Sequence, residues 1–170
     1  MKETHRLDIE SRSFEVSPDL NVARKSHSVV VLGTSLYVVC GYNEEFLSSI
    51  EKLDVTIKNS AWSLLAIPDL IGREQAFVTR VSDQEIVVAG GKNVDGNIND
   101  VSIVNTARCF ARRAKGIIDN PYVKPFICVS QAHGLEPFAL IEQNKGLPLS
   151  AVEFDRTNQK LDCFHNFRQC

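Results

Sequence analysis

The sequence predicts an all-β fold assembled from repeated four-stranded sheets. Apolar residues occur in short runs of β-like length, such as SVVVLG, LYVVCG and EIVVAGG, and turn residues end each run. Two stretches, which begin at Ser35 and Gln84, share one pattern at a spacing of about 50 residues. The run LYVVCG is apolar on both faces, which is typical of a strand covered on both sides by neighbouring sheets.

The composition is that of a globular domain. The 170 residues are 44% hydrophobic and carry a net charge of −2, which gives no electrostatic case for nucleic acid or for an anionic membrane. The apolar runs are far shorter than the ~20 residues that a membrane-spanning helix needs. The N-terminus lacks an apolar signal region. Five cysteines without paired spacing favour a reducing compartment, so we expect a cytoplasmic location.

The repeat is defined by aligned positions in the two stretches. Gly41 aligns with Gly91 and Glu51 with Val101, each at a separation of 50, and Arg24 aligns with Arg73 at 49. A third, weaker copy, PFALIEQNKGLPLSAVEFD, ends 101 residues beyond Asp54. A period near 50 residues is typical of propeller blades.

These residues resemble the kelch repeat, in which an apolar strand ends in Gly-Gly, a variable loop follows, the next strand carries an acidic residue and the fourth strand a Trp. The positions that carry the resemblance are Arg24, His27, Gly41, Glu51, Asp54, Trp62, Arg73, Gly90, Gly91 and Asp100. Cys40 departs from the pattern where the first glycine would stand, and no Trp occurs near Cys109. The resemblance implies a partial kelch-type β-propeller of about three and a half blades.

The expected organisation is one domain over residues 1–170. It comprises the last two strands of a blade (4–17), two blades (22–65 and 71–111) and a degenerate blade (122–168). Known propellers close with four to eight blades. We therefore expect the chain to correspond to the C-terminal part of a longer propeller, or to self-associate through its open blade edges.

The glycine loop at residues 90–100 allows two other interpretations. A dinucleotide-binding turn requires a helix after the glycines, and the Asn- and Asp-rich segment that follows disfavours one. Asp95, Asn97 and Asn99 have the spacing of the first calcium ligands of an EF-hand, but the required glycine and glutamate are absent. Asp, Asn and Gly also favour simple turns.

No catalytic or metal constellation stands out, so we expect no enzyme activity, no metal and no cofactor. His27 lies between Ser26 and Ser28, whose side chains would point away from it on a strand. Cys163, His165 and Cys170 lack a fourth zinc ligand with partner spacing.

The sequence favours a non-catalytic module that binds another protein through the loops after the second strands. The predicted binding residues are Tyr42, Asn43, Glu44, Glu45, Phe46, Lys92, Asn93, Asp95, Asn97 and Asn99. Tyr42 and Phe46 are the expected anchors, because exposed aromatic residues concentrate binding energy, although covering a blade end would explain them equally well. The alternatives are the remnant of a propeller enzyme acting on a sugar or small molecule, and a degenerate fragment without function.

Overall fold

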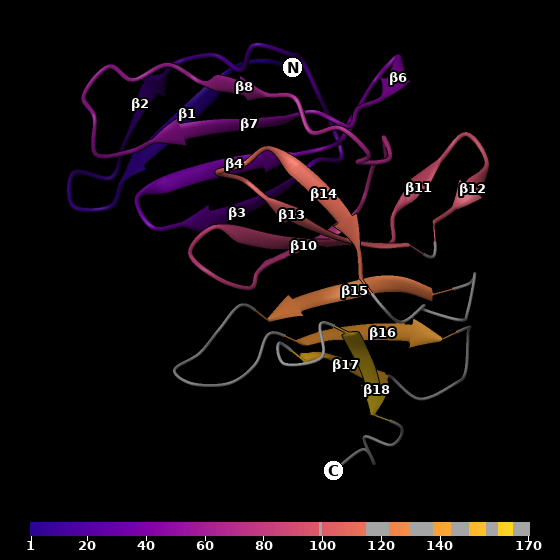
Figure 1. Ribbon diagram of the computed structural model, residues 1–170. Coiled ribbons are helices and arrows are strands. Elements are labelled where there is room, and N and C mark those ends of the chain that lie inside the picture. Colours follow the sequence, from indigo (N-terminus) through magenta and orange to yellow (C-terminus); the bar gives the residue numbers. More distant parts are fainter. Residues whose placement is uncertain (99, 115–122, 130–137, 144–149, 156–159, 165–170) are drawn as a thin grey trace.

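The fold is all-β. The computed structural model describes residues 1–98, 100–114, 123–129, 138–143, 150–155 and 160–164, and these residues contain strands and turns but no helix (Figure 1). They therefore include no helix that could span a membrane. All strand pairs are antiparallel, in three four-stranded sheets and three two-stranded ones. This confirms the predicted all-β class, with the four-stranded antiparallel sheets expected of propeller blades.

Each four-stranded sheet is one blade, and its strands follow each other in chain order. The N-terminal hairpin consists of β1 (Thr4–Asp8) and β2 (Ser13–Ser17). Blade 1 consists of β3 (Ser28–Leu32), β4 (Ser35–Val39), β7 (Ile50–Asp54) and β8 (Ser63–Leu65). Blade 2 consists of β9 (Phe77–Arg80), β10 (Glu85–Ala89), β13 (Val101–Asn105) and β14 (Phe110–Arg113). Blade 3 consists of β15 (Val123–Val129), β16 (Phe138–Gln143), β17 (Ser150–Asp155) and β18 (Lys160–Phe164).

Two small hairpins extend from the blades between the second and third strands. They are β5 (Tyr42–Asn43) with β6 (Glu45–Phe46), and β11 (Lys92–Asn93) with β12 (Gly96–Asn97).

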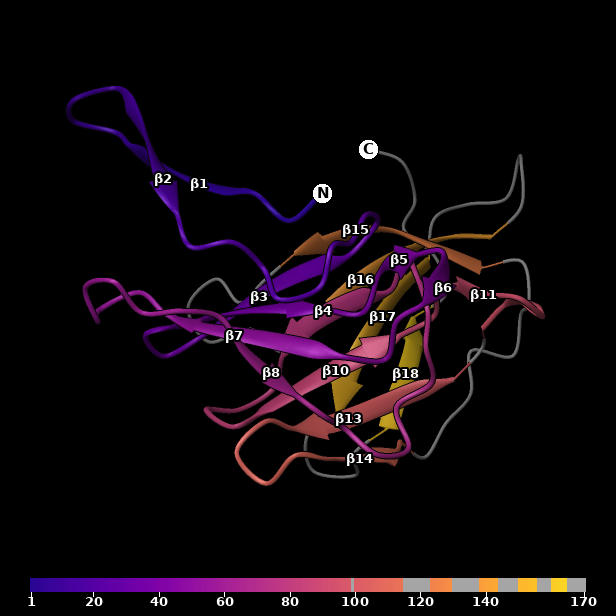
Figure 2. The same ribbon diagram turned by 90° about the horizontal axis from the view of Figure 1, so that it is seen from above.

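The blades are stacked through their first strands. β9 contacts β3 on one side and β15 on the other, and the four sheets follow one another from the N-terminal hairpin to blade 3 (Figure 1). Viewed from above, the N-terminal hairpin diverges from blade 1 (Figure 2).

The main core fills the interface between blades 1 and 2. Its buried residues include Val39 and Ile50 from blade 1 and Ile86, Val88 and Val104 from blade 2, all with no exposed surface. Each buried aliphatic side chain of this kind contributes about 1.5–3 kcal/mol to folding. The apolar run of β4 is thus buried because another sheet covers it, as the sequence predicts.

The repeat extends to backbone conformation. Arg12, Asn59 and Cys109 stand in the turns between the third and fourth strands of successive sheets, and their φ values are +53°, +61° and +53°. Ser26 and Gln75, 49 residues apart, each stand two residues before a first strand, and their φ values are +52° and +57°. The left-handed conformation is uncommon for residues other than glycine, so its recurrence marks structurally equivalent positions.

The structure corrects one detail of the sequence alignment. The N–H of Cys40 donates to the carbonyl of Ser49, and the N–H of Gly90 donates to the carbonyl of Asp100. Ser49 therefore corresponds to Asp100, and Glu51 corresponds to Ser102 instead of Val101. The loop in blade 2 is one residue longer, which shifts the third strand by one position in sequence.

Candidate functional site

The loops after the second strands occupy equivalent places in blades 1 and 2. The first loop is residues 42–46 and contains β5 and β6; the second loop is residues 92–97 and contains β11 and β12. Both loops extend from the same side of the molecule in both views (Figures 1 and 2). Each is closed at its base by one backbone hydrogen bond, from Leu47 N to Gly41 O and from Ile98 N to Gly91 O, each at 2.9 Å.

Glycine is required at the start of each loop. Gly41 has φ +109°, and a Cβ there would lie 2.9 Å from the carbonyl oxygen of Lys25. Gly91 has φ +85°, and a Cβ there would lie 2.6 Å from the carbonyl oxygen of Glu74. The close approach allows two pairs of reciprocal backbone bonds, one pair between Lys25 and Tyr42 and the other between Glu74 and Lys92. The glycines thus fix both loops to the segments that precede the first strands.

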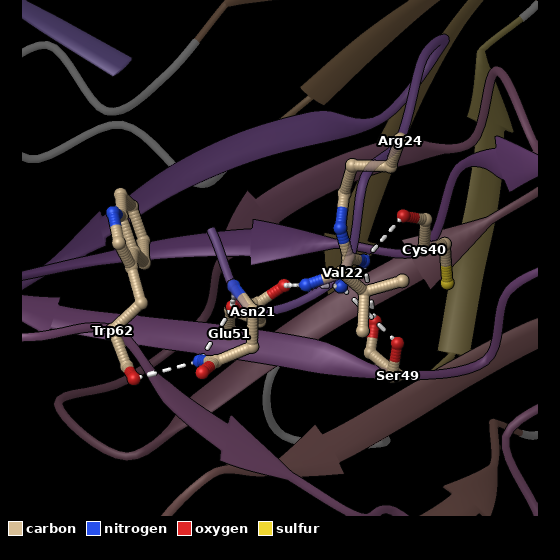
Figure 3. Close-up of polar contacts among 7 residues, drawn as sticks. All are labelled: Asn21, Val22, Arg24, Cys40, Ser49, Glu51 and Trp62. Atoms are coloured by element: carbon tan, nitrogen blue, oxygen red, sulfur yellow. Dashed lines mark hydrogen bonds and ion pairs between the residues drawn. The ribbon is translucent and has the colours of Figure 1, made fainter. Parts of the chain in front are cut away.

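A buried arginine supports the loop base in blade 1 (Figure 3). The Arg24 guanidinium donates to the carbonyl of Cys40 at 2.7 Å, to Ser49 and to Glu51, whose carboxylate lies 2.7 Å away. Arg24 and Glu51 have side chains with no exposed surface. The carbonyl of Cys40 belongs to the residue in the left-handed turn, so the arginine satisfies an acceptor that the sheet leaves unpaired.

Blade 2 achieves the same support with the polar residues exchanged. Arg73 donates to the carbonyl of Gly90 at 3.1 Å and to the Asp100 carboxylate at 2.6 Å. Asp100 stands where blade 1 has Ser49, and Ser102, at the position of Glu51, lies within 3.3 Å of the Asp100 carboxylate. The carboxylate that pairs with the arginine therefore stands at a different place in each blade, Glu51 within β7 and Asp100 directly before β13.

Glu51 also attaches the linker that leads into blade 1. The backbone N–H groups of Asn21 and Val22 donate to its carboxylate at 2.6 and 3.0 Å, and the Asn21 side chain bridges Glu51 to the carbonyl of Trp62 (Figure 3). Burial acts to raise the pKa of Glu51, but these backbone bonds and the bond from Arg24 outweigh it and hold the pKa below its ordinary value. Glu51 is therefore ionised at neutral pH.

Cys40 replaces the first glycine of the pattern and is buried. It retains the left-handed conformation, with φ +58° against +62° at Gly90. Its thiol packs in the core between blades 1 and 2, and burial, opposed by the nearby Arg73 and Arg24, raises its pKa to about 11.

The aromatic residues of the first loop are packed rather than freely exposed. Tyr42 and Phe46 are half-buried and contact each other edge to face at 5.1 Å between ring centroids, and the Lys25 ammonium lies 5.2 Å from the Tyr42 ring. Both rings are thus less exposed than expected, because the reciprocal pairing with Lys25 holds Tyr42 against the loop base, and their role as binding anchors stays a prediction. The exposed side chains of the loop are Asn43, Glu44 and Glu45.

The second loop presents an apolar side chain that the sequence reasoning missed. Val94 is 83% exposed at the turn between β11 and β12, beside exposed Asp95. Asn93 accepts the N–H of Asp95 at 2.9 Å, which closes the turn, and Lys92 forms an ion pair with Glu74 at 3.1 Å. The sequence feature that could have revealed Val94 is its position between two turn-forming residues, Asn93 and Asp95. Asn97 is exposed, and Asn99 lies outside the described residues.

The remaining predicted positions stabilise turns and linkers. Asp54 accepts from the backbone and hydroxyl of Thr56 at 2.9 and 2.7 Å, and so caps the turn after β7. Trp62 is buried just before β8, where its indole N–H donates to the carbonyl of Pro18 at 2.8 Å. His27 is exposed one residue before β3; desolvation and the charge of Arg24 lower its pKa.

The described part of the chain was also compared with the calcium and zinc interpretations of the sequence. No group of three or more His, Cys, Asp or Glu side chains is placed there to hold an ion. The side chains of Cys163, His165 and Cys170 lie outside it.

Comparison with known families supports the resemblance given by the residues. Residues 23–67 match the kelch motif, which covers the linker into blade 1 and all four of its strands. The chain contains a kelch repeat. The kelch motif places Arg24, Gly41, Glu51 and Trp62 within one matched unit, and blade 2 repeats the left-handed backbone positions of that unit. A search of curated proteins gave no match to the chain.

Proposed function

We propose that this kelch-repeat chain is a non-catalytic interaction module that binds a protein partner through the first and second loops. The observation that carries the proposal is the contrast between base and tip in these loops. The bases are fixed by glycines, reciprocal backbone pairing and buried arginines, whereas the tips expose their side chains. Binding residues on loops positioned by a rigid scaffold are a general feature of recognition.

The chemistry of the tips indicates the kind of surface that they fit. The first loop exposes Glu44 and Glu45, and the second exposes Asp95 beside Val94. The lysines at the loop bases are engaged, Lys25 with the Tyr42 ring and Lys92 with Glu74. The tips are therefore acidic with one apolar projection, which suits a partner surface that offers basic side chains around a small apolar recess. We further propose that this interaction takes place in the cytoplasm, a location that five cysteines without paired spacing favour.

The test compares partner capture by loop variants and by matched variants at the opposite ends of the strands. One variant carries Glu44→Ala and Glu45→Ala, and another carries Val94→Ser and Asp95→Ala. The control changes Lys58 and Arg108 to alanine, because both are exposed in turns between third and fourth strands, away from the loops. Quantitative mass spectrometry of captured proteins should show partners that both loop variants lose and the control retains. If the loop variants capture the same partners at the same abundance as the unmodified chain, the loops are not the binding surface.

A further inference from the structure

Part of the blade 1 face that points away from blade 2 is apolar and uncovered. Val29 and Val31 alternate on β3 and are both 53% exposed. They lie opposite Val38 and Leu36 on β4 in the strand register. The outer part of the same face is covered, since Val38, Leu53 and Trp62 pack with Leu20 from the linker.

The repeat shows what covers the equivalent surface in the next blade. Val78 on β9 stands 49 residues after Val29 and is only 6% exposed. It is buried in the core to which β3 and β4 contribute Leu32, Tyr37 and Val39, and β3 contacts β9 directly. Val78 is buried because β3 and β4, the first two strands of the preceding blade, cover it. Within the described residues no equivalent pair of strands covers Val29, so its side chain is exposed.

The N-terminal hairpin supplies the other half of the same surface. The backbone N–H of Arg24 donates to the carbonyl of Met1, as the N–H of Arg73 donates to that of Leu47, so β1 holds the place of a third strand. In blades 1 and 2 the third strand is paired on both sides, by β4 and β8 and by β10 and β14. Within the described residues, β1 is paired only with β2, and a groove of about 900 Å³ lies between this hairpin and blade 1.

We propose that Val29 and Val31 together with the free edge of β1 form a docking surface for a β-hairpin from another polypeptide segment. The second strand of that hairpin pairs with β1 in antiparallel orientation, and its side chains cover Val29. The sequence that this hairpin needs can be inferred from β3 and β4, which cover the equivalent face of blade 2. Both strands are uncharged, and alternate residues such as Leu32, Tyr37 and Val39 pack against blade 2. Strand addition at a sheet edge obtains affinity from main-chain hydrogen bonds and specificity from alternate side chains.

A second copy of this chain is a poorer occupant. Antiparallel pairing of two β1 edges about a twofold axis would place both copies of blade 1 on the same face of the shared sheet. The two copies of blade 1 would then occupy the same face of the shared sheet, and neither would leave room for strands that cover Val29 of the other. The proposal concerns the blade 1 face that points away from blade 2 and the edge of β1, and it uses no residue of the first or second loop, so it stands or falls independently of the proposed function.

The first test uses a synthetic peptide of residues 26–41 with Cys40→Gly, which forms the β3–β4 hairpin sequence without a thiol, added to the full chain. We expect saturable binding of one peptide per chain and slower hydrogen exchange in β1. Val29→Lys should abolish binding, because a lysine at a buried apolar contact is strongly disfavoured. Leu64→Lys is the matched control, since Leu64 is 51% exposed on the outer strand β8 of the same blade; it should bind the peptide as the unmodified chain does.

A second measurement avoids peptide aggregation by joining a copy of residues 24–46 directly before Met1. The extended chain should melt roughly 4–10 °C higher, because it buries apolar surface that the chain exposes. Val29→Lys should leave the Tm of the unextended chain nearly unchanged and should cancel the gain in the extended one. Absence of binding together with absence of a Tm gain would overturn the proposal. So would binding that survives Val29→Lys, or a chain dimer that this variant dissociates, which would identify a second copy as the occupant.

Discussion

Arg24 and Glu51 form an ion pair in which both side chains have no exposed surface and the guanidinium lies 2.7 Å from the carboxylate. The pair connects three parts of blade 1: the linker before β3, the turn after β4 and the third strand. Burying two charges carries a desolvation cost that hydrogen bonds must offset. The additional bonds to Cys40, Ser49, Asn21 and Val22 satisfy most of the remaining donors and acceptors.

Glu51→Gln should destabilise the chain by about 3–5 kcal/mol, because it leaves the Arg24 charge buried without its counterion. Urea unfolding followed by the fluorescence of Trp62, the single tryptophan, measures the change. Glu15→Gln is the control, because its partner Arg6 is exposed and such pairs contribute about 0–1 kcal/mol. Equal losses in the two variants would show that the buried pair has no special role.

Exchanging the polar residues of blade 1 for those of blade 2 should preserve the support for the loop. The double variant Ser49→Asp with Glu51→Ser reproduces the Asp100 and Ser102 arrangement around the other arginine. It should recover at least half of the stability that Glu51→Ser alone removes, although the bonds from Asn21 and Val22 are lost. A double variant no more stable than Glu51→Ser would mean that the carboxylate position is not interchangeable between blades.

Acid should destabilise the chain partly through Glu51. The folded-state pKa of Glu51 lies below its ordinary value of 4.5, so its contribution is complete above that pH and is lost as pH falls through the lower folded value. Melting temperatures between pH 7 and pH 3 should therefore fall more steeply for the unmodified chain than for Glu51→Gln. Parallel curves would assign the acid sensitivity to other carboxyl groups, such as Asp8 and Asp54, whose pKa values are also lowered.

The Cys40 thiol should resist alkylation in the folded chain. Its pKa is raised to about 11, and it is 1% exposed, so little thiolate is present or accessible at pH 8. Iodoacetamide labelling with peptide mass spectrometry should modify Cys40 only in urea and modify the half-buried Cys109 faster in the native chain. Burial also disfavours the Cys40 thiolate in the folded chain. The free energy of unfolding should therefore fall as pH rises above 9.0, the ordinary pKa of the thiol. Labelling of Cys40 at equal rates in both states would contradict its burial.

Gly91→Ala should be much more costly than Gly33→Ala. Both residues have positive φ, which costs alanine roughly 1–2 kcal/mol. A Cβ at Gly33 meets nothing within 4 Å, whereas at Gly91 it would lie 2.6 Å from the carbonyl oxygen of Glu74. We expect about 1–3 kcal/mol of additional destabilisation from this overlap, measured by urea unfolding. Similar losses of stability at both sites would show that the loop base moves to accommodate the added Cβ without a cost in free energy.

The sequence predicts local features well and spatial pairings less well. The strands around LYVVCG and EIVVAGG follow from apolar runs ended by glycine, and the structure places strands there. The partner of each repeat arginine depends on a loop length that differs by one residue between the blades, so alignment alone put Glu51 opposite Val101. The half-buried state of Tyr42 depends on Lys25, which reaches it across the loop base and not along the chain.

The hydrogen bonds that close the bases of the first and second loops keep changes in loop length from altering the blades. The bond from Leu47 to Gly41 encloses five residues, and the bond from Ile98 to Gly91 encloses six, yet the strands that follow keep equivalent places in their sheets. An insertion at a tip is therefore absorbed before it reaches a blade, and the register of the sheet does not shift. Loops of this kind can diverge rapidly in sequence and length while the rest of the chain stays under selection for packing. The same property makes residues 43–45 and 94–97 suitable places to insert randomised segments when new binding specificities are selected from this scaffold.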